Sequence, residues 1–367
     1  MNRLDKMPTR MPLDATFELT VRCNLKCKMC LFRHDDSENK QIMMKEKTAK
    51  EWIDMAKQAA DTGTLSLLIT GGEPLIRPDF PEIYEAIYKM GFFITLYTNA
   101  TMISEKIKNL LRKYPPHKVG ITIYGSSPEV YEKVSGNGDA FYRLLEGIRF
   151  LKTLPSRFEA RTTIIQDNYD DIYNIEELVK NEIGPNCTLT HSRTVYKPVR
   201  GACGDVDSCR LTPKQNVRLY LRRELDQVKE KVEKEGLDIE RIQIAFEGPK
   251  AKPIEKDKPE NLTLLGCSAG MDSYTISWDG KLLACQILGN FYTEPFEVGF
   301  QKAWNEFPFK VEIPKKFDKK CDVCKNRSIC NACYACRYAE TGDLGGAPTY
   351  VCKDLEELTS VININEK

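Results

Sequence analysis

Three cysteines near the beginning of the chain, Cys23, Cys27 and Cys30, have the spacing Cys-x3-Cys-x2-Cys. This spacing gathers three thiolates in one tight loop, so a four-iron cluster held there keeps one iron without a protein ligand. Such an iron can coordinate a small molecule. A zinc site is the alternative, and because closed structural zinc sites have four ligands, it would need a further side chain such as His34.

A glycine-rich segment, Gly71-Gly72-Glu73-Pro74, offers a second element of chemistry. Two successive glycines permit the backbone to approach a ligand closely, and Glu73 adds an acceptor for a cation. A segment of this kind often forms only a turn. Here it follows the next predicted strand after the cysteine triplet, and we therefore interpret it as part of the same site.

Most of the other cysteines lie in the C-terminal part of the chain. They are Cys267, Cys285, Cys321, Cys324, Cys330, Cys333, Cys336 and Cys352. A predicted hairpin with its turn at Asp279-Gly280 places the first two on flanking segments that can meet around one metal centre. The Cys-x2-Cys-x5-Cys spacing of the next three offers thiolates from a compact turn, for which a pair of zinc ribbons is the alternative. We expect Cys187, Cys203 and Cys209 to be small buried apolar side chains.

The elements that would position these residues alternate between strand and helix over residues 14–195. The predicted strands are Thr16–Val21, Leu65–Thr70, Phe92–Thr98, Val119–Tyr124, Glu159–Ile165 and Cys187–Thr194. The predicted helices are Lys47–Asp61, Phe80–Met90, Ser104–Lys113, Phe141–Leu151 and Asn174–Glu182. Apolar β-branched runs bounded by helices are typical of a parallel sheet covered by helices. We predict an α/β fold, a partial (β/α)6 TIM-like barrel followed by a small cysteine-rich iron–sulfur domain, with a doubly wound open sheet as the alternative to the barrel.

We predict a tail at 1–13, the barrel at 14–195, a linker with one long helix at 196–260, the cysteine-rich domain at 261–353 and a second tail at 354–367. The long helix would follow Thr212 as its N-cap, with Pro213 in the first turn.

The composition argues against several classes of protein. With 54 basic and 53 acidic residues the net charge is +1, so no overall field draws the chain to nucleic acid or to an anionic membrane. No apolar run reaches the roughly 20 residues of a membrane span, and the N-terminus lacks the apolar stretch of a secretion signal. We expect a cytoplasmic protein, in which 14 cysteines serve as metal ligands rather than as disulfides.

The triplet together with the Gly-Gly-Glu-Pro segment resembles the radical S-adenosylmethionine (SAM) enzymes over roughly residues 14–195. The resemblance implies that Cys23, Cys27 and Cys30 hold a 4Fe-4S cluster whose open iron chelates S-adenosyl-L-methionine. It implies that one electron breaks the S–C5′ bond and that the adenosyl radical abstracts a hydrogen from the substrate. The implied cofactor contacts are Gly71, Gly72, Glu73 and Pro74, Met29 beside the adenine, and Asn99, Thr122 and Arg161 at the ribose or carboxylate. The last three are otherwise ordinary polar residues at strand ends.

The C-terminal pattern Cys-x12-Gly-x4-Cys, Cys-x2-Cys-x5-Cys and a last cysteine resembles the SPASM extension, which usually carries two auxiliary four-iron clusters. The resemblance implies that Cys321, Cys324, Cys330 and Cys352 hold the second auxiliary cluster. Cys267 and Cys285 would hold the first, with Cys333 or Cys336. Some relatives have a further cysteine where this chain has Ser273. The first auxiliary cluster therefore has an open iron, or a ligand from Cys203, Cys209 or the spare of Cys333 and Cys336.

This resemblance implies anaerobic oxidation of a ribosomally made peptide, by dehydrogenation or by a thioether or C–C crosslink. Sulfatase-maturing relatives carry an aspartate base where this chain has Gln286, which argues against that reaction. A dehydrogenase or epimerase of a small metabolite such as a sugar is the alternative, and a non-enzymatic iron–sulfur carrier is least favoured. The expected partners are the substrate and a low-potential donor such as flavodoxin or ferredoxin. Because the barrel begins about a dozen residues into the chain, we expect that a separate protein recognises a leader peptide, that the enzyme recognises its substrate directly, or that the substrate is a small metabolite.

Overall fold

A computed structural model of the chain describes residues 9–235, 264–311, 313–314 and 316–362. The chain divides into two compact units. The barrel unit comprises Met1–Arg210 and Leu262–Ile313, and the C-terminal unit comprises Leu211–Asn261 and Pro314–Lys367. The predicted boundary at residue 261 stays a prediction. Residues 262–313 group with the barrel unit.

The barrel unit is built on a sheet that has nine strands among the described residues, in the order β6-β5-β4-β3-β2-β1-β7-β8-β9. The strands are β1 (Asp14–Glu18), β2 (Ser66–Thr70), β3 (Phe93–Thr98), β4 (Lys118–Thr122), β5 (Arg157–Thr163), β6 (Leu189–Ser192), β7 (Ser273–Ile276), β8 (Leu282–Leu283) and β9 (Tyr292–Thr293). The strands from β6 to β7 are parallel to their neighbours, and β8 and β9 are antiparallel. A doubly wound sheet would reverse its strand order at a switch point. The consecutive order from β1 to β6 instead agrees with the predicted partial barrel.

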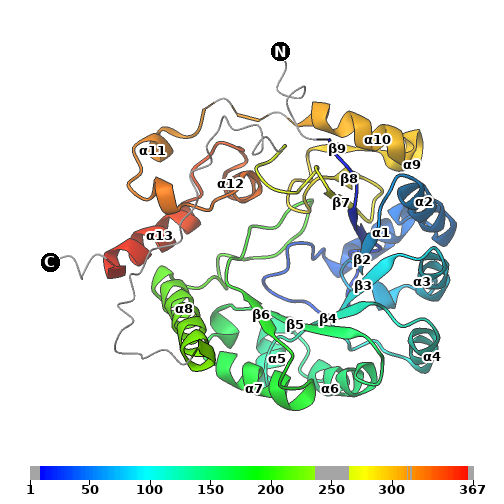
Figure 1. Cartoon of the computed structure of the whole chain (residues 1–367), viewed down its shortest axis with the longest axis horizontal. Coiled ribbons are helices and arrows are strands. Elements are labelled where there is room, and N and C mark those ends of the chain that lie inside the picture. The colour runs from blue at the N-terminus through cyan, green and yellow to red at the C-terminus, as the bar shows by residue number, and fades with distance from the viewer. Residues whose placement is uncertain (1–8, 236–263, 312, 315, 363–367) are drawn as a thin grey trace. The chain divides into compact units, whose positions relative to one another are not determined.

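Helices cover the outer face of this sheet, as Figure 1 shows for α2, α3, α4, α6 and α7. The helices of the unit are α1 (Asn39–Lys45), α2 (Ala49–Asp61), α3 (Phe80–Lys89), α4 (Glu105–Lys113), α5 (Pro128–Ser135), α6 (Ala140–Leu151), α7 (Ile172–Glu182), α9 (Pro295–Val298) and α10 (Phe300–Glu306). Strand side chains alternate between the two faces, so Leu67 and Ile69 of β2 are fully buried. Trp52 of α2 packs on Phe17 of β1 with ring centres 5.1 Å apart.

The six predicted strands and five predicted helices of the barrel all form, with shifted ends. The first strand ends at Glu18 instead of Val21, so the cysteine triplet follows it at a greater distance than expected. The hairpin at Asp279-Gly280 is confirmed by the antiparallel pairing of β7 with β8, and Gly280 adopts a φ of 88°. The sequence did not predict that β7 also pairs with β1. The sequence also did not predict α1, α5, α9, α10 and β9.

The C-terminal unit contains α8 (Pro213–Glu235), α11 (Lys319–Asp322), α12 (Tyr334–Thr341) and α13 (Thr349–Ile362). The predicted N-cap of the long helix is confirmed, because Thr212 Oγ1 accepts a hydrogen bond from the Gln215 amide at 3.3 Å. Asn216 of α8 donates to Tyr350 and Asp354 of α13 at 3.0 and 2.9 Å, which ties the two helices together. Within the described residues, every helix is too short or too polar to cross a membrane.

Candidate functional site

The cysteine loop, residues 23–30, follows β1 and rests on α5. The Lys26 and Lys28 amides donate to the carbonyls of Ser135 and Val134 at 2.7 and 3.1 Å. Within the loop, the Cys30 amide donates to the Cys27 carbonyl at 3.2 Å. Helix α5 begins at Pro128 with Ser127 as its N-cap, and this signal could have revealed the helix from the sequence.

Of the three cysteines of the loop, Cys27 is buried and Cys23 and Cys30 are partly exposed, and their thiols lie near one another. Burial raises the pKa of Cys23 well above its usual value, and neighbouring Cys27 and Glu73 raise it further. Burial raises the pKa of Cys27 to about 12, with a contribution from Cys30, while a hydrogen bond with Tyr124 opposes the shift. Thiolates crowded in a dry site need a compensating cation. Iron bound to the sulfurs would supply that charge.

The donor set fits a cluster better than a single zinc ion. Among the residues that the structure describes, no three His, Cys, Asp or Glu side chains converge closely enough to hold one metal ion. A four-iron cluster makes no such demand, because each thiolate binds a different iron. His34, the fourth ligand that a zinc site would need, lies with its Nδ1 3.1 Å from Glu38 Oε2.

The two glycines after β2 bring the Gly-Gly-Glu-Pro segment against the start of the cysteine loop. The Gly72 and Glu73 amides donate to the carbonyls of Thr20 and Arg22 at 2.7 and 2.9 Å. A Cβ on Gly71 would lie 2.2 Å from Thr20 O, and one on Gly72 would lie 2.4 Å from Arg22 O. The glycines therefore serve a close approach of the chain to itself, a role that the sequence analysis assigned to a ligand.

Glu73 is fully buried and joins the ends of β2 and β3. Its carboxylate accepts hydrogen bonds from the Leu75 amide at 3.1 Å, the Thr98 hydroxyl at 2.8 Å and the Asn99 amide at 2.8 Å. Burial raises the pKa of Glu73 to about 7, and these hydrogen bonds oppose the shift. A carboxylate has about four lone-pair positions, so three donors leave room for one more partner.

Asn99 reaches the cysteine loop. Its Nδ2 lies 3.7 Å from Cys23 Sγ and donates to Asn24 Oδ1 at 3.0 Å. Thr101 completes the network, since it donates to Asn99 Oδ1 at 2.6 Å and accepts from Asn24 Nδ2 at 2.8 Å. The structure thus places Asn99 at a predicted cluster ligand, whereas the resemblance implied a contact with the ribose or carboxylate of the cofactor.

Arg161 and Thr122 are neighbours in register on β5 and β4. The Arg161 guanidinium lies 4.6 Å from the centre of the Tyr97 ring, and its Nε lies 3.8 Å from Glu159. Gly120 makes room for that ring, because a Cβ there would lie 2.4 Å from it. The side chain of Arg161 is 40 % exposed, so its guanidinium offers an accessible positive charge on the inner face of the sheet.

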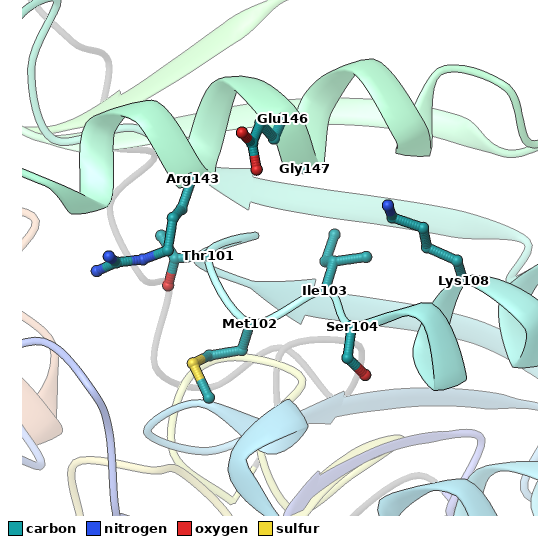
Figure 2. Close-up of a pocket in the computed structure, with 8 residues that line it drawn as sticks. All are labelled: Thr101, Met102, Ile103, Ser104, Lys108, Arg143, Glu146 and Gly147. Atoms are coloured by element: carbon teal, nitrogen blue, oxygen red, sulfur yellow. The ribbon is translucent and has the colours of Figure 1, made fainter.

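A shallow cavity of about 300 Å³ lies beside this site rather than in it. Figure 2 shows its lining by the loop after β3, from Thr101 to Ser104, by Lys108 of α4 and by Arg143, Glu146 and Gly147 of α6. None of the predicted cofactor contacts lines it. Gly147 packs on the Ala100 carbonyl, from which a Cβ would be 2.1 Å away, and so supports the loop that carries Asn99.

Residues 199–204 form a segment, here called the strap, that packs beside the end of the cysteine loop. The sequence did not predict this contact. The Val199 and Cys203 amides donate to the carbonyls of Leu31 and Arg33 at 3.3 and 2.8 Å. Arg200, at a φ of 57°, forms a bidentate ion pair with buried Glu18 of β1 at 2.6 and 2.9 Å. These contacts join segments that are distant in the sequence, so no short motif predicts them.

The three isolated cysteines are not all buried as expected. Cys209 is fully buried, which confirms the expectation for that residue. Cys203 is exposed on the strap and Cys187 is partly exposed, so the expectation was wrong for Cys203 and only partly right for Cys187.

The C-terminal unit gathers the four cysteines predicted to hold the second auxiliary cluster. Burial raises the pKa of Cys352, and the nearby charges of Cys330, Cys321 and Cys324 raise it further. Arg337 of α12 lies with its Nη1 3.3 Å from Cys321 Sγ. Such a charge beside the sulfur was not predicted from the sequence.

Cys333 and Cys336 lie together at the start of α12. The Cys333 sulfur caps the helix and accepts from the Cys336 amide at 3.4 Å. Cys336 is buried, and burial together with Cys333 raises its pKa to about 12, whereas Cys333 is exposed. Cys267 and Cys285 belong to the barrel unit and flank the β7–β8 hairpin. Their assignment to a first auxiliary cluster stays a prediction.

Comparison with known proteins points to similar enzymes. Residues 17–179 match the model of the radical SAM superfamily. An AdoMet-dependent heme synthase of Methanosarcina barkeri is 29 % identical over 345 residues, which cover 91 % of this chain and 95 % of that protein. The antilisterial bacteriocin subtilosin biosynthesis protein AlbA of Bacillus subtilis is 23 % identical over 340 residues, or 88 % and 67 % of the two chains.

Among solved structures, Streptococcus suis SuiB bound to S-adenosylmethionine superposes with a TM-score of 0.66 at 18 % identity, over 95 % of this chain and 79 % of SuiB. This likeness shows the fold. The cysteine-rich C-terminal part fits a SPASM extension. The cysteine triplet, the parallel sheet and the matched residues 17–179 together show that the chain contains a radical SAM domain.

Proposed function

We propose that the protein is a radical SAM oxidoreductase that modifies a ribosomally made peptide after hydrogen abstraction, by dehydrogenation or by a thioether or C–C crosslink. The observation that carries the proposal is the second group of cysteines, in which Cys352 lies near Cys330, Cys321 and Cys324. A further cluster there would accept the electron that an oxidation releases. The likeness in sequence to AlbA, a bacteriocin biosynthesis protein, supports a peptide as substrate.

We assign the three 4Fe-4S clusters to the cysteines that the sequence predicted. In the barrel unit, the reduced cluster would supply the electron that cleaves S-adenosyl-L-methionine into methionine and a 5′-deoxyadenosyl radical. The second auxiliary cluster falls to Cys321, Cys324, Cys330 and Cys352. The first falls to Cys267 and Cys285 with Cys333 or Cys336. A flavodoxin or ferredoxin would be the electron donor, and a separate protein would present the leader peptide.

The chain's own groups would orient the cofactor. Glu73 has one lone-pair position left for the ammonium group of the methionine moiety, next to the backbone of Gly71–Pro74. Arg161 offers its guanidinium to the carboxylate, on the face that it shares with Thr122. Met29, which is buried in the cysteine loop, would pack beside the adenine.

The test is an anaerobic assay of the full chain reconstituted with iron and sulfide. With S-adenosyl-L-methionine and dithionite, we expect 5′-deoxyadenosine, measured by chromatography. With a candidate peptide encoded near the gene, we expect a product lighter by the mass of two hydrogens for each modification. Absence of 5′-deoxyadenosine would refute radical chemistry. Its release without a mass change in any such peptide would refute the peptide as substrate.

A tetrapyrrole is the second candidate substrate. The observation that favours it is the match to a heme synthase over 95 % of that protein's length. The same assay with an iron porphyrin that carries carboxylate side chains separates the two candidates. A change in the porphyrin absorbance and mass, with no change in the peptides, would assign the protein to tetrapyrrole oxidation.

A further inference from the structure

Arg337 holds a permanent positive charge against the sulfur of a predicted cluster ligand. Its Nη1 lies 3.3 Å from Cys321 Sγ, and the residue is 8 % exposed. A guanidinium does not lose its proton in proteins. The sulfur of Cys321 is therefore faced by a full charge that water screens only weakly.

The position of this guanidinium is set by several contacts. Nη1 also donates to the Gly346 carbonyl at 2.8 Å, and Nε donates to the Ala332 carbonyl at 3.1 Å. The guanidinium lies 4.9 Å from the centre of the Phe317 ring, which in turn stacks on Tyr334 of α12. Arg337 is thus fixed before any cluster binds, and its distance to the sulfur does not depend on a mobile side chain.

The surroundings of Arg337 call for an anion. In the part of the chain that the structure describes, its hydrogen-bond acceptors are two backbone carbonyls and the Cys321 sulfur. A buried charge is costly unless an opposite charge compensates it. A cluster held by four thiolates carries a net negative charge. It would provide that compensation where Cys321, Cys324, Cys330 and Cys352 meet.

We propose that Arg337 raises the reduction potential of the second auxiliary cluster and thereby makes it an electron acceptor. The inference rests on the proposed function, because it requires a cluster at these cysteines. Reduction adds negative charge, so a cation fixed at a ligand sulfur stabilises the reduced state more than the oxidised state. In the proposed oxidation a cluster held by these cysteines would accept one electron from the substrate radical, and water would take up the proton. The electron then leaves through a one-electron carrier protein.

Arg327 provides a matched control, because it approaches the same cysteine without touching its sulfur. Its Nη1 donates to the Cys321 carbonyl at 3.1 Å and pairs with Asp322 at 3.2 Å. Its side chain is 45 % exposed. Water and Asp322 therefore screen the charge of Arg327, whereas that of Arg337 acts on the sulfur directly.

The experiment measures the midpoint potential of the clusters in the full chain. A Cys23→Ala/Cys27→Ala/Cys30→Ala background removes the SAM-binding cluster. The reconstituted protein is titrated with dithionite, and electron paramagnetic resonance spectra are recorded at each potential. Cys324→Ala in that background identifies the signal of the second auxiliary cluster by its loss. We expect Arg337→Gln to shift that potential to a more negative value, Arg337→Lys to shift it less, and Arg327→Gln to leave it close to that of the parent.

The outcomes separate the inference from the proposed function. If Cys324→Ala removes neither iron nor a signal, no cluster is present in the C-terminal unit, and that part of the proposed function fails. If the cluster is present and Arg337→Gln leaves its potential unchanged, the inference fails alone. Equal shifts in Arg337→Lys and Arg337→Gln would indicate packing instead of charge and would also overturn it. Arg337→Lys keeps the charge in place if the glutamine variant does not fold.

Discussion

The two groups of cysteines differ in the donors that face their sulfurs. In the barrel unit, neutral groups approach the thiols, namely Asn99 Nδ2 at Cys23 and the Tyr124 hydroxyl at Cys27. The nearby cation Arg33 lowers the pKa of Cys27, but it donates to the Lys26 carbonyl and not to a sulfur. In the C-terminal unit, Arg337 donates to Cys321 Sγ.

This difference matches the two tasks that the proposed reaction would give to the clusters. A cluster that must donate an electron to S-adenosyl-L-methionine needs a low potential, which burial favours and which neutral donors raise less than a buried cation does. A cluster that must accept an electron from the substrate needs a higher potential, which a buried cation favours. The same ligand type can therefore serve opposite redox roles, because the surrounding donors set the potential.

Replacing the predicted cysteine ligands should give the largest difference between the two groups of cysteines. We expect Cys23→Ala, Cys27→Ala or Cys30→Ala to abolish release of 5′-deoxyadenosine, because each removes a predicted ligand of the SAM-binding cluster. Cys324→Ala or Cys330→Ala should leave that release partly intact while product formation stops. Chromatography and mass spectrometry of the two assays distinguish the groups. Normal turnover in the Cys324 or Cys330 variants would make the C-terminal cysteines purely structural.

Glu73 gives the next largest effect, as a change of stability with pH. Its folded pKa of about 7 lies above the usual 4.5, so the folded protein favours the protonated acid. The contribution of Glu73 to stability should be fully present below pH 4.5 and should be lost as the pH rises towards 7 and beyond, by about 3 kcal/mol in the cluster-free protein. Glu73→Gln has no proton to lose and should lack this fall. Urea unfolding across that pH range measures the stability of both proteins. If the free energy of unfolding changes with pH equally in both, the carboxyl does not have this role.

Gly72→Ala should loosen the contact between the two motifs of the barrel site. A Cβ there would meet the Arg22 carbonyl, so overpacking should cost about 1–3 kcal/mol of stability and reduce iron binding by the triplet. Gly63→Ala is the control, because no atom lies within 4 Å of its Cβ position, although its φ of 110° adds some strain of its own. Urea unfolding and iron content should therefore separate the variants. Equal iron loss in both would contradict the steric reason.

Asn99→Ala should give the smallest effect and sharpen the comparison of donors. It removes one neutral hydrogen bond to Cys23 Sγ, a contribution of about 0.5–1.5 kcal/mol. We expect a small negative shift of the potential of the barrel cluster, smaller than the shift that Arg337→Gln causes in the other cluster. Redox titration of the two single variants measures both shifts. A larger shift in Asn99→Ala would reverse the proposed order of the two donors.

Much of the barrel could be predicted from the sequence, because its strands and tight turns depend on residues that are close together in the chain. The apolar runs located the six strands, and the glycine pair marked the tight contact after β2. The sequence could not reveal which partner that contact serves, because the Thr20 and Arg22 carbonyls are distant along the chain. The ion pair of Arg200 with Glu18 and the contact of Arg337 with Cys321 were missed for the same reason. Both depend on segments that meet only in the folded protein.

The pairing of β7 with β1 has a consequence for how the protein is made. The ribosome releases β1 first, and the segment that covers its free side emerges only after most of the chain has been synthesised. Until then, the bare backbone of β1 is a template on which another nascent chain can add a strand. Shortened versions that stop before β7 would keep this vulnerability permanently, so we expect them to be recovered as insoluble material.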